Sequence, residues 1–119
     1  MQDLLIIGAG PSGIYAAFQA GLRGVKAMVV DSLPLQGGLL TTFYPDKPIY
    51  DIPGYPTILA QELFDQLMAQ INPFEPTFTL GERVESLEKL EDETFIVRTN
   101  EGTAVHSKVI AIAGGLGCF

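Results

Sequence analysis

The fold of this chain is decided by residues 3–31, which read DLLIIGAGPSGIYAAFQAGLRGVKAMVVD. An apolar run at residues 4–7 leads directly into a glycine-rich turn at residues 8–13, and a helical pattern follows it. A second apolar run, residues 25–30, ends at Asp31. This order predicts a strand, a tight turn, a helix and a second strand. Two parallel strands joined by a helix take a right-handed crossover, so the stretch is one βαβ unit.

Three glycines of the turn have different roles. Gly8 allows the tight turn off the first strand, Gly10 lets the backbone approach a pyrophosphate, and Gly13 lets the helix pack closely on the sheet. The first helical turn directs unpaired N–H groups and the positive end of the helix dipole at the same place, which favours an anion. A purely structural turn is the alternative, but the strand before the turn and the helix after it favour a dinucleotide.

Asp31 narrows the choice of dinucleotide. It lies 18 residues after Gly13, close to the spacing of about 20 at which a carboxylate reaches the 2′-hydroxyl of the adenosine ribose. The same carboxylate repels a 2′-phosphate. The sequence therefore predicts FAD or NAD(H) at this site in preference to NADP(H).

The composition excludes several classes of function. A chain of 119 residues makes one small domain. Its formal net charge of −7 argues against a nucleic-acid or anionic-membrane partner, since both need clustered Lys and Arg. The single cysteine, Cys118, cannot form an internal disulfide and fits a reducing, cytoplasmic location. No signal peptide is recognised and no apolar run approaches about 20 residues, so we expect no membrane association.

Residues 32–56 lack regular periodicity and are rich in proline, glycine and aromatic residues. We predict an ordered loop over a ligand there, because long irregular segments in compact domains are commonly functional. A loop packed only on its own aromatic side chains is the alternative. After this segment, we expect Thr57 to cap a helix with apolar residues every four positions, and Pro73 to end that helix.

The second half of the chain predicts a meander followed by a buried strand. Alternating apolar and polar residues indicate short strands at 77–80, 82–90, 94–99 and 104–108. Turn signals separate the last three, so these three make an antiparallel meander. Residues 109–113 are continuously apolar, which is typical of a strand buried in the parallel sheet beside the first strand.

Together, these motifs resemble one known family. The chain is similar to the N-terminal half of the FAD domain of thioredoxin-reductase-like ferredoxin–NADP reductases, over essentially its whole length. The likeness rests on the turn GAGPSG at residues 8–13, the acid after the second strand, the glycine pair at 37 and 38, YPDKPIYDIPGYP at residues 44–56 and AIAGGLGCF at residues 111–119. Residues 44–54 are its most specific part, because the glycine turn alone would fit many flavoproteins.

The resemblance implies a fold and a reaction. The fold would be a three-layer, Rossmann-like FAD/NAD(P)-binding α/β domain, in which a parallel sheet has helices on one face and an antiparallel β-meander on the other. Proteins of this family pass electrons from NADPH through FAD to ferredoxin or flavodoxin, and they are often homodimers. The flavin performs the hydride chemistry, so we expect no catalytic side chain within these residues.

The resemblance also implies which residues bind FAD. The glycine turn would hold the pyrophosphate, Asp31 the adenosine ribose, and Val84 would contact the adenine side. Tyr44 would lie against the flavin, Asp51 would be a polar group near it, and Phe119 would lie at the flavin or its ribityl chain. The expected cofactor-binding residues are Gly8, Gly10, Ser12, Gly13, Asp31, Gly38, Leu39, Tyr44, Asp51, Val84 and Phe119.

The chain departs from the family pattern in two ways, and each changes what we expect of FAD binding or of activity. The family usually has Gln where this chain has Leu39, so one hydrogen bond to FAD is lost. The family also continues well past residue 119, through an NADPH-binding domain and the rest of the FAD domain. We therefore expect residues 1–119 to be a partial FAD-binding domain that does not oxidise NADPH alone and that exposes an apolar patch on residues 109–113.

Two other functions stay open. A thioredoxin reductase would need a Cys-x-x-Cys pair from sequence beyond this chain, because Cys118 is its only cysteine. A stand-alone module could bind FAD, ADP or NAD without redox turnover. We expect no metal site, because His106 has no second His or Cys near it, and we expect the acidic residues within 82–93 to form a solvated face.

Overall fold

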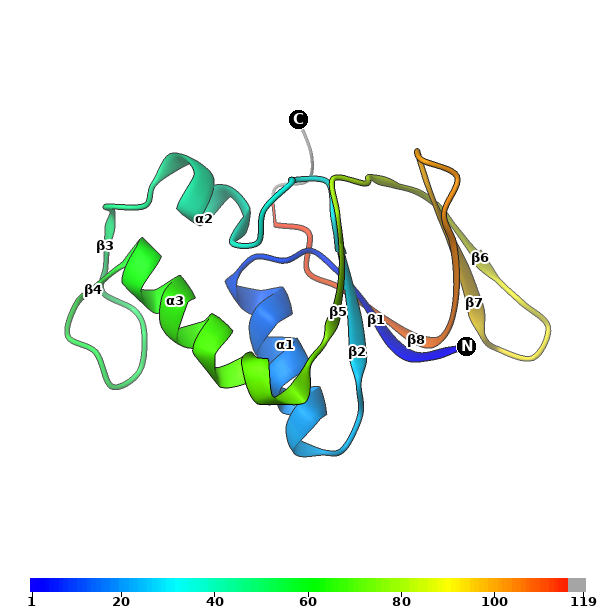
Figure 1. The fold of residues 1–119 in the computed structure, drawn as a ribbon, viewed down its shortest axis with the longest axis horizontal. Helices are drawn as coiled ribbons and strands as arrows, with labels where there is room; N and C mark the ends of the chain where they lie inside the picture. The colour runs from blue at the N-terminus through cyan, green and yellow to red at the C-terminus, as the bar shows by residue number, and fades with distance from the viewer. Residues whose placement is uncertain (116–119) are drawn as a thin grey trace.

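A computed structural model describes residues 1–115 of the chain, apart from the side chains of Leu39, Leu40 and Thr42 (Figure 1). The strands are β1 (Gln2–Ile7), β2 (Ala27–Asp31), β3 (Pro48–Ile49), β4 (Ile58–Leu59), β5 (Thr77–Leu80), β6 (Val84–Lys89), β7 (Phe95–Thr99) and β8 (Ala104–Ile112). The helices are α1 (Pro11–Leu22), α2 (Gly38–Phe43), α3 (Ala60–Ile71) and the 3₁₀ helix η1 (Asn72–Phe74). Within this part of the chain, no helix is long and apolar enough to cross a membrane.

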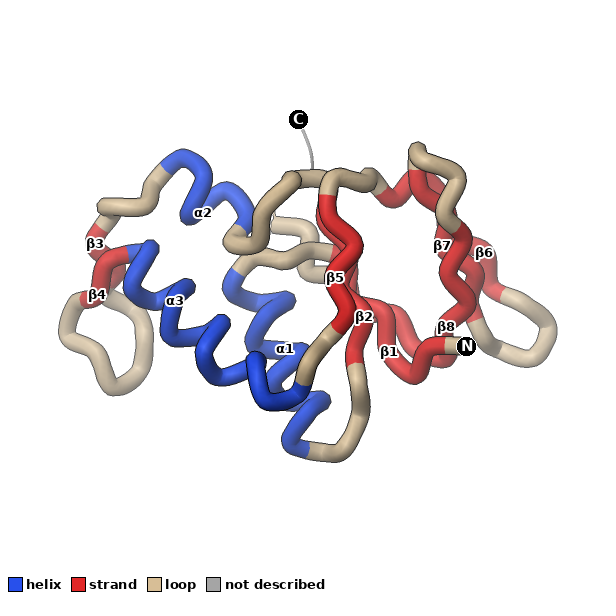
Figure 2. Tube along the Cα trace, viewed as in Figure 1, coloured by secondary structure: helices blue, strands red, loops and turns tan. Residues whose placement is uncertain are grey.

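Six strands form one sheet, in the order β5-β2-β1-β8-β7-β6. The first four strands in this order are parallel, whereas β7 runs antiparallel to β8, and β6 antiparallel to β7. Figure 2 shows the three layers: helices α1 and α3, the parallel strands in the middle, and strands β6 and β7 on the opposite side. The predicted three-layer fold class is therefore confirmed.

Strand β8 belongs to both parts of the sheet, which the sequence did not predict. We expected two strands, at 104–108 and 109–113, but β8 is one continuous strand of nine residues. Its first residues pair with β7, and from Ser107 onward it pairs with β1. No glycine or proline separates the two expected strands, so the change of partner needs no turn. Ser107 is buried at this change, and its hydroxyl donates to the Val109 carbonyl over 2.8 Å.

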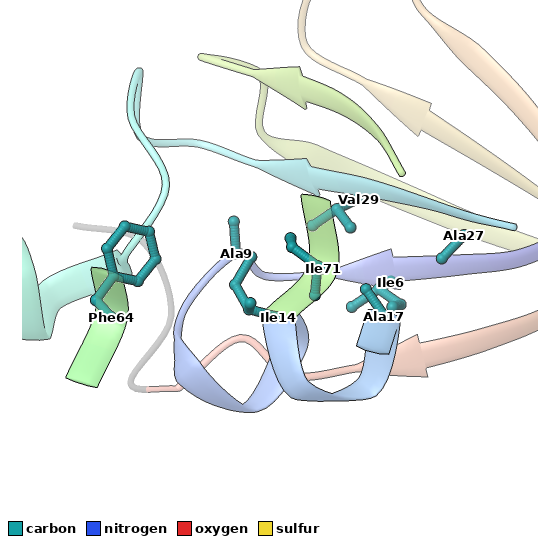
Figure 3. Close-up of a cluster of buried hydrophobic side chains, with 8 residues drawn as sticks. All are labelled: Ile6, Ala9, Ile14, Ala17, Ala27, Val29, Phe64 and Ile71. Carbon is teal, nitrogen blue, oxygen red and sulfur yellow. The ribbon is translucent and has the colours of Figure 1, made fainter. Parts of the chain in front are cut away.

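Both faces of the parallel sheet are buried, because successive side chains of a strand point to opposite faces. Ile6 and Val29 pack against the helices, whereas Leu5 and Val30 pack against the meander. The helix-side cluster, drawn in Figure 3, consists of Ile6, Ala9, Ile14, Ala17, Ala27, Val29, Phe64 and Ile71. The meander-side cluster consists of Leu5, Val30, Val97 and Val105. This packing fixes the carboxyl ends of β1 and β2, where the candidate site begins.

The segment predicted as an irregular loop contains regular structure. Within residues 32–56, the chain forms the short helix α2 and strand β3. Strand β3 pairs antiparallel with β4, and a further bridge joins Ile52 and Tyr55. We call residues 44–59, which include this hairpin, the arm. The arm lies beside the N-terminal end of α3, as Figure 1 shows.

The start of α3 corrects the prediction that Thr57 caps this helix. The helix begins at Ala60, three residues later, and no side chain caps it. Instead, the N–H groups of Ala60 and Gln61 donate to the carbonyls of Lys47 and Pro45, over 3.0 Å in each case. Both acceptors lie in the arm, just before strand β3. A local sequence pattern could not have revealed them.

The last part of β8 leaves apolar side chains at the surface, as expected for residues 109–113. Val109 is 54% exposed and Ile112 is 77% exposed. On the side that faces β7 earlier in the strand, residues 108–112 have no strand partner within the described residues.

Candidate functional site

The candidate site begins where β1 turns into α1. Gly8 has φ 116°, and a Cβ there would lie 2.1 Å from the carbonyl oxygen of Ala113, so only glycine fits. The Gly8 N–H donates to the Val30 carbonyl over 2.8 Å. A Cβ on Gly13 would lie 1.8 Å from the Gly8 carbonyl oxygen, which shows how closely α1 approaches the turn. The turn is thus fixed between β2, α1 and the end of β8.

Helix α1 opens toward this turn with uncapped donors. Gly10 is its N-cap residue, no side chain caps it, and Pro11 has no N–H group. The Ile14 N–H donates to the Gly10 carbonyl over 3.0 Å. Within residues 1–115, we find no acceptor for the N–H groups of Gly10, Ser12 and Gly13. Three such donors at the positive end of a helix dipole can bind phosphate oxygens.

Asp31 lies at the same corner, at the end of β2. Its Oδ2 accepts the N–H of Ala9 over 2.7 Å, and its Oδ1 accepts the N–H of Leu33 over 3.0 Å. The carboxylate therefore ties the glycine turn to the chain that leaves β2. Each carboxylate oxygen has two acceptor positions, so each keeps one for a hydroxyl group. The contact between Asp31 and a ribose itself stays a prediction.

A second pair of glycines closes against the first turn. The Gly37 N–H donates to the Ala9 carbonyl over 2.8 Å. A Cβ on Gly38, which has φ 65°, would lie 3.2 Å from the Cα of Gly10. A side chain at Gly38 would therefore press on the first turn. We define the glycine corner as residues 8–13, 31–33 and 37–38. The contact of Gly38 with a cofactor, which the resemblance implies, stays a prediction.

An open groove of about 490 Å³ continues the glycine corner along the arm. Its lining residues are Pro11, Lys47, Pro48, Ile49, Tyr50, Asp51, Ile52 and Leu63. Pro11 belongs to both the groove and the corner. The structure thus brings Asp51 together with the start of α1, in an apolar groove that carries one positive and one negative side chain.

The aromatic side chains of the arm differ from the expectation. Tyr44 does not line the groove, and its ring packs on Phe43 with 6.4 Å between ring centroids. The Nζ of Lys47 lies 5.4 Å from the Tyr44 ring centroid. Tyr50 does line the groove and is 72% exposed. The sequence analysis missed Tyr50 and Lys47 as lining residues, although both stand in the most specific segment of the resemblance.

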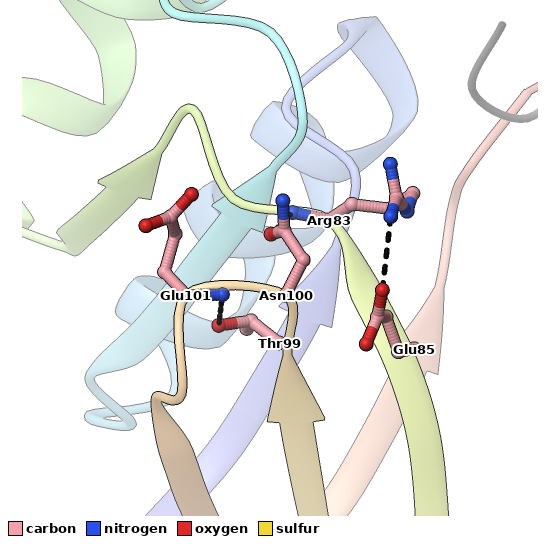
Figure 4. A network of polar contacts seen from close by, with 5 residues as sticks. All are labelled: Arg83, Glu85, Thr99, Asn100 and Glu101. Carbon is pink, nitrogen blue, oxygen red and sulfur yellow. Dashed lines mark hydrogen bonds and ion pairs between the residues drawn. The ribbon is translucent and has the colours of Figure 1, made fainter.

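Val84 lies near the backbone of Asp31. It follows Glu82 by two residues, and the Glu82 N–H donates to the Asp31 carbonyl over 3.1 Å. Val84 is half-buried at the start of β6 and packs against the meander-side cluster. Arg83, which lies between Glu82 and Val84 in the sequence, forms an exposed ion pair with Glu85 at 2.9 Å (Figure 4). Val84 is therefore close to Asp31 and is not one of the residues that line the groove, and its contact with adenine stays a prediction.

Other expected groups lie elsewhere. Leu39 belongs to α2, but its side chain lies outside the described residues, as do Phe119 and Cys118. The Nε2 of His106 lies 2.7 Å from the Thr94 hydroxyl, far from the corner in the meander. Within residues 1–115, no group of three or more His, Cys, Asp or Glu residues is arranged to hold a metal ion.

Two carboxyl groups of the meander have pKa values below their ordinary ones. Hydrogen bonds from the hydroxyls of Thr103 and Thr99 lower the pKa of Glu82. The hydroxyl and N–H of Thr94 lower the pKa of Asp92. Both groups are therefore carboxylates at neutral pH, held by neutral donors.

Comparison with known sequences gives a consistent result. The model of the FAD dependent oxidoreductase family matches residues 3–107. The ferredoxin–NADP reductase of Flavobacterium johnsoniae is 62% identical over 117 residues, which cover 98% of this chain and 33% of that protein. Ferredoxin–NADP reductase 2 of Christiangramia forsetii is 59% identical over the same coverage. The chain thus spans about a third of the length of the curated relatives it matches.

Comparison with solved structures supports the same fold. Thioredoxin reductase from Streptococcus pyogenes matches with a TM-score of 0.80 and 26% identity, over 94% of this chain and 34% of that one. A cyclohexanone monooxygenase matches with a TM-score of 0.74 over 93% of this chain and 26% of that one. Its identity is 22%, so this second likeness concerns the fold alone.

Proposed function

The chain belongs to the FAD dependent oxidoreductase family, and we propose that it forms the FAD-binding part of a reductase that passes electrons from NADPH through FAD to ferredoxin or flavodoxin. The observation that carries this proposal is the glycine corner. Its free N–H groups at Gly10, Ser12 and Gly13 and the carboxylate of Asp31 face one place. The 62% identity to a ferredoxin–NADP reductase supports the choice of reaction.

The corner fits the adenosine diphosphate half of FAD. The donors of the α1 N-terminus would bind the pyrophosphate, and the remaining acceptor positions of Asp31 would bind ribose hydroxyls. Gly8, Gly13 and Gly38 keep this space free, because a Cβ on any of them would collide with or press on the backbone. The negative charge of Asp31 would disfavour a 2′-phosphate, which is consistent with FAD.

The groove fits the other half of the cofactor. It begins at Pro11, beside the pyrophosphate donors, and continues along Lys47, Tyr50 and Asp51. An exposed tyrosine in an apolar groove offers a flat surface for an aromatic ring system. FAD would supply the hydride and electron transfer, while the residues of the arm would bind and orient its ring. We therefore replace Tyr44 by Tyr50 as the proposed aromatic contact of the flavin.

We propose that NADPH binding and the remaining steps of the reaction need parts of a protein outside residues 1–119. Because the chain spans about a third of its curated relatives, we place NADPH binding outside residues 1–119 and expect no NADPH oxidation by this chain alone. We also propose a cytoplasmic homodimer as the form of the whole reductase. The ferredoxin or flavodoxin acceptor would be its partner.

The first test is a titration of the purified chain with FAD, followed by its visible absorbance and flavin fluorescence. We expect saturable binding that Asp31→Ala weakens at least about tenfold, because a hydrogen-bonded charge is lost. Asp3→Ala is the matched control, since Asp3 pairs only with Lys108 at the surface, over 3.1 Å. An unchanged FAD affinity in Asp31→Ala would contradict the proposed site.

A disulfide reductase is the second candidate, because the S. pyogenes thioredoxin reductase shares the fold at 26% identity. The identity to ferredoxin–NADP reductases is more than twice as high. A Cys-x-x-Cys pair in any sequence beyond residue 119, together with thioredoxin-dependent NADPH oxidation, would favour this candidate over the first.

A further inference from the structure

The segment between β5 and β6 holds the chain that leaves Asp31. The Glu82 N–H donates to the Asp31 carbonyl over 3.1 Å, and the Gly81 N–H donates to the Leu33 carbonyl over 2.9 Å. Residues 31–33 are therefore held on one side by Gly81 and Glu82. On the other side, the Asp31 carboxylate is bonded to the glycine turn through the Ala9 N–H.

The side chain of Glu82 fixes this segment to the turn between β7 and β8. Its Oε1 accepts the hydroxyl of Thr99 over 2.7 Å and that of Thr103 over 2.5 Å. Thr99 is buried, and its own hydroxyl oxygen accepts the N–H groups of Glu101 and Thr103, each over 3.3 Å. One oxygen of the Glu82 carboxylate thus accepts hydrogen bonds from two hydroxyls. One of these hydroxyls, that of Thr99, also accepts backbone N–H groups of the same turn.

Backbone bonds beside Glu82 complete this connection. The Arg83 N–H donates to Asn100 Oδ1 over 2.8 Å, and the Asn100 N–H donates to the Arg83 carbonyl over 2.9 Å. Figure 4 shows Asn100 and Thr99 side by side on the turn that faces Arg83. Residues 81–83 therefore join the meander to the glycine corner as one hydrogen-bonded bridge.

The direction of the Asp31 carboxylate depends on this bridge. One of its oxygens is bonded to the Leu33 N–H, two residues away, so a shift of Leu33 would turn the carboxylate. Leu33 is held from outside by the Gly81 N–H, next to Glu82. The side chain of Glu82 joins this bridge to the hydroxyls of Thr99 and Thr103.

We propose that Glu82 is a positioning residue for the adenosine half of the dinucleotide site, which fixes the Asp31 carboxylate through residues 81–83 and thereby sets the preference against a 2′-phosphate. This inference rests on the proposed function, because it concerns how the same site recognises its ligand. Glu82 itself is assigned no contact with the nucleotide. Its lowered pKa, caused by the two threonine hydroxyls, keeps it ionised and able to accept both at neutral pH.

The test measures the affinity of the 119-residue chain for ADP and for ADP that carries a 2′-phosphate, by calorimetry. We expect Glu82→Ala to weaken ADP binding about tenfold and to reduce the preference for ADP over its 2′-phosphate. Glu82→Gln keeps an acceptor oxygen in the same place, so we expect it to restore both values to within about threefold of the unmodified chain. Glu88→Ala, which removes a more exposed carboxylate paired with Arg98, is the control.

The outcomes separate this inference from the proposed function. If the unmodified chain binds neither nucleotide, both are overturned. If it binds ADP and Glu82→Ala keeps the same preference between the two ligands, or loses both equally, only the role of Glu82 is overturned. Should Glu82→Ala fail to fold, Thr103→Val removes one of the two hydroxyls. An unchanged preference in Thr103→Val would then overturn the role of Glu82, and a reduced one would support it.

Discussion

The glycine corner and the arm form the two ends of one candidate site, yet they are built in opposite ways. The corner consists mainly of backbone: Gly8, Ala9 and Gly13 are buried, and the N–H groups of Gly8 and Ala9 donate to Val30 and Asp31 of β2. The arm consists of two-residue strands that present exposed rings, including Tyr50 and Tyr55. The difference teaches that the diphosphate of the proposed dinucleotide would meet mainly backbone atoms, which side-chain substitutions do not remove, whereas the other half would meet side chains that can change.

The largest expected effect comes from adding one methyl group to the corner. Gly13→Ala would place its Cβ 1.8 Å from the Gly8 carbonyl oxygen, so α1 must move away from the turn. We expect the free energy of unfolding to fall by about 3 kcal/mol, together with loss of nucleotide binding. Chemical denaturation measures this change.

Gly114→Ala is the matched control for Gly13→Ala. A Cβ at Gly114 meets no atom within 4 Å, and this residue lies outside the left-handed region of φ. The stability of Gly114→Ala should stay within about 0.5 kcal/mol of that of the unmodified chain. Equal stability of the two variants would break the comparison, because the corner would then tolerate side chains as the arm does.

The arm should affect ligand choice without affecting stability. Tyr50→Ala removes an exposed ring from the groove, so we expect FAD to bind about tenfold more weakly while ADP binding and the unfolding transition stay unchanged. Fluorescence titrations with both ligands measure this difference. Tyr44→Ala is the control, since Tyr44 lies outside the groove. If only Tyr44→Ala weakens FAD binding, then Tyr44 and not Tyr50 contacts the flavin, as the resemblance implies.

Low pH should weaken the hydrogen bonds of Glu82 that support the glycine corner. The pKa of Glu82 lies below its ordinary value of 4.5, because two hydroxyls favour the ionised form in the folded chain. Its contribution to stability is therefore complete above pH 4.5 and is lost as the pH falls through the lowered pKa. Asp92, lowered from 3.8, follows the same sign in a lower window. Denaturant midpoints recorded from pH 7 to pH 3 should fall less steeply in Glu82→Gln than in Glu88→Gln.

The smallest effect is expected at the tip of the arm. The Tyr55 hydroxyl donates to Gln66 Oε1 at an exposed position. Tyr55→Phe removes this bond where water replaces it, so we expect a change in stability within about 0.5 kcal/mol. Thermal unfolding measures it. A loss above about 2 kcal/mol would show that the arm is as tightly fixed as the corner.

The sequence predicted the corner better than the arm for a physical reason. Close backbone approach requires glycine, so Gly8 and Gly13 could be recognised from residue type and spacing, whereas Gly38 was named through the resemblance. The start of α3 is set by carbonyls of Lys47 and Pro45, which are remote in sequence, and the predicted Thr57 cap was therefore wrong. The groove depends on which face of the arm turns inward. Residue type does not determine that, so Tyr50 was not named as a lining residue. The Tyr44 contact with the flavin, which the resemblance implies, stays a prediction.

The meander strands were located nearly at their observed bounds, but their connection to the parallel sheet was not. The boundary expected near residue 108 followed from a change of pattern, from alternating to continuously apolar residues. That change marks a new neighbour across the sheet, β1 in place of β7, and leaves the strand itself unbroken.

Because β8 is shared, we expect the domain to unfold as a single unit. The strand is bonded to β7 at one end and to β1 at the other, and the Ala113 N–H beyond it donates to the Ile7 carbonyl over 2.7 Å, next to Gly8. We therefore expect detachment of the meander to disturb the turn at residues 8–13. Slow amide hydrogen exchange in β7 would therefore report on the integrity of a turn on the opposite side of the sheet.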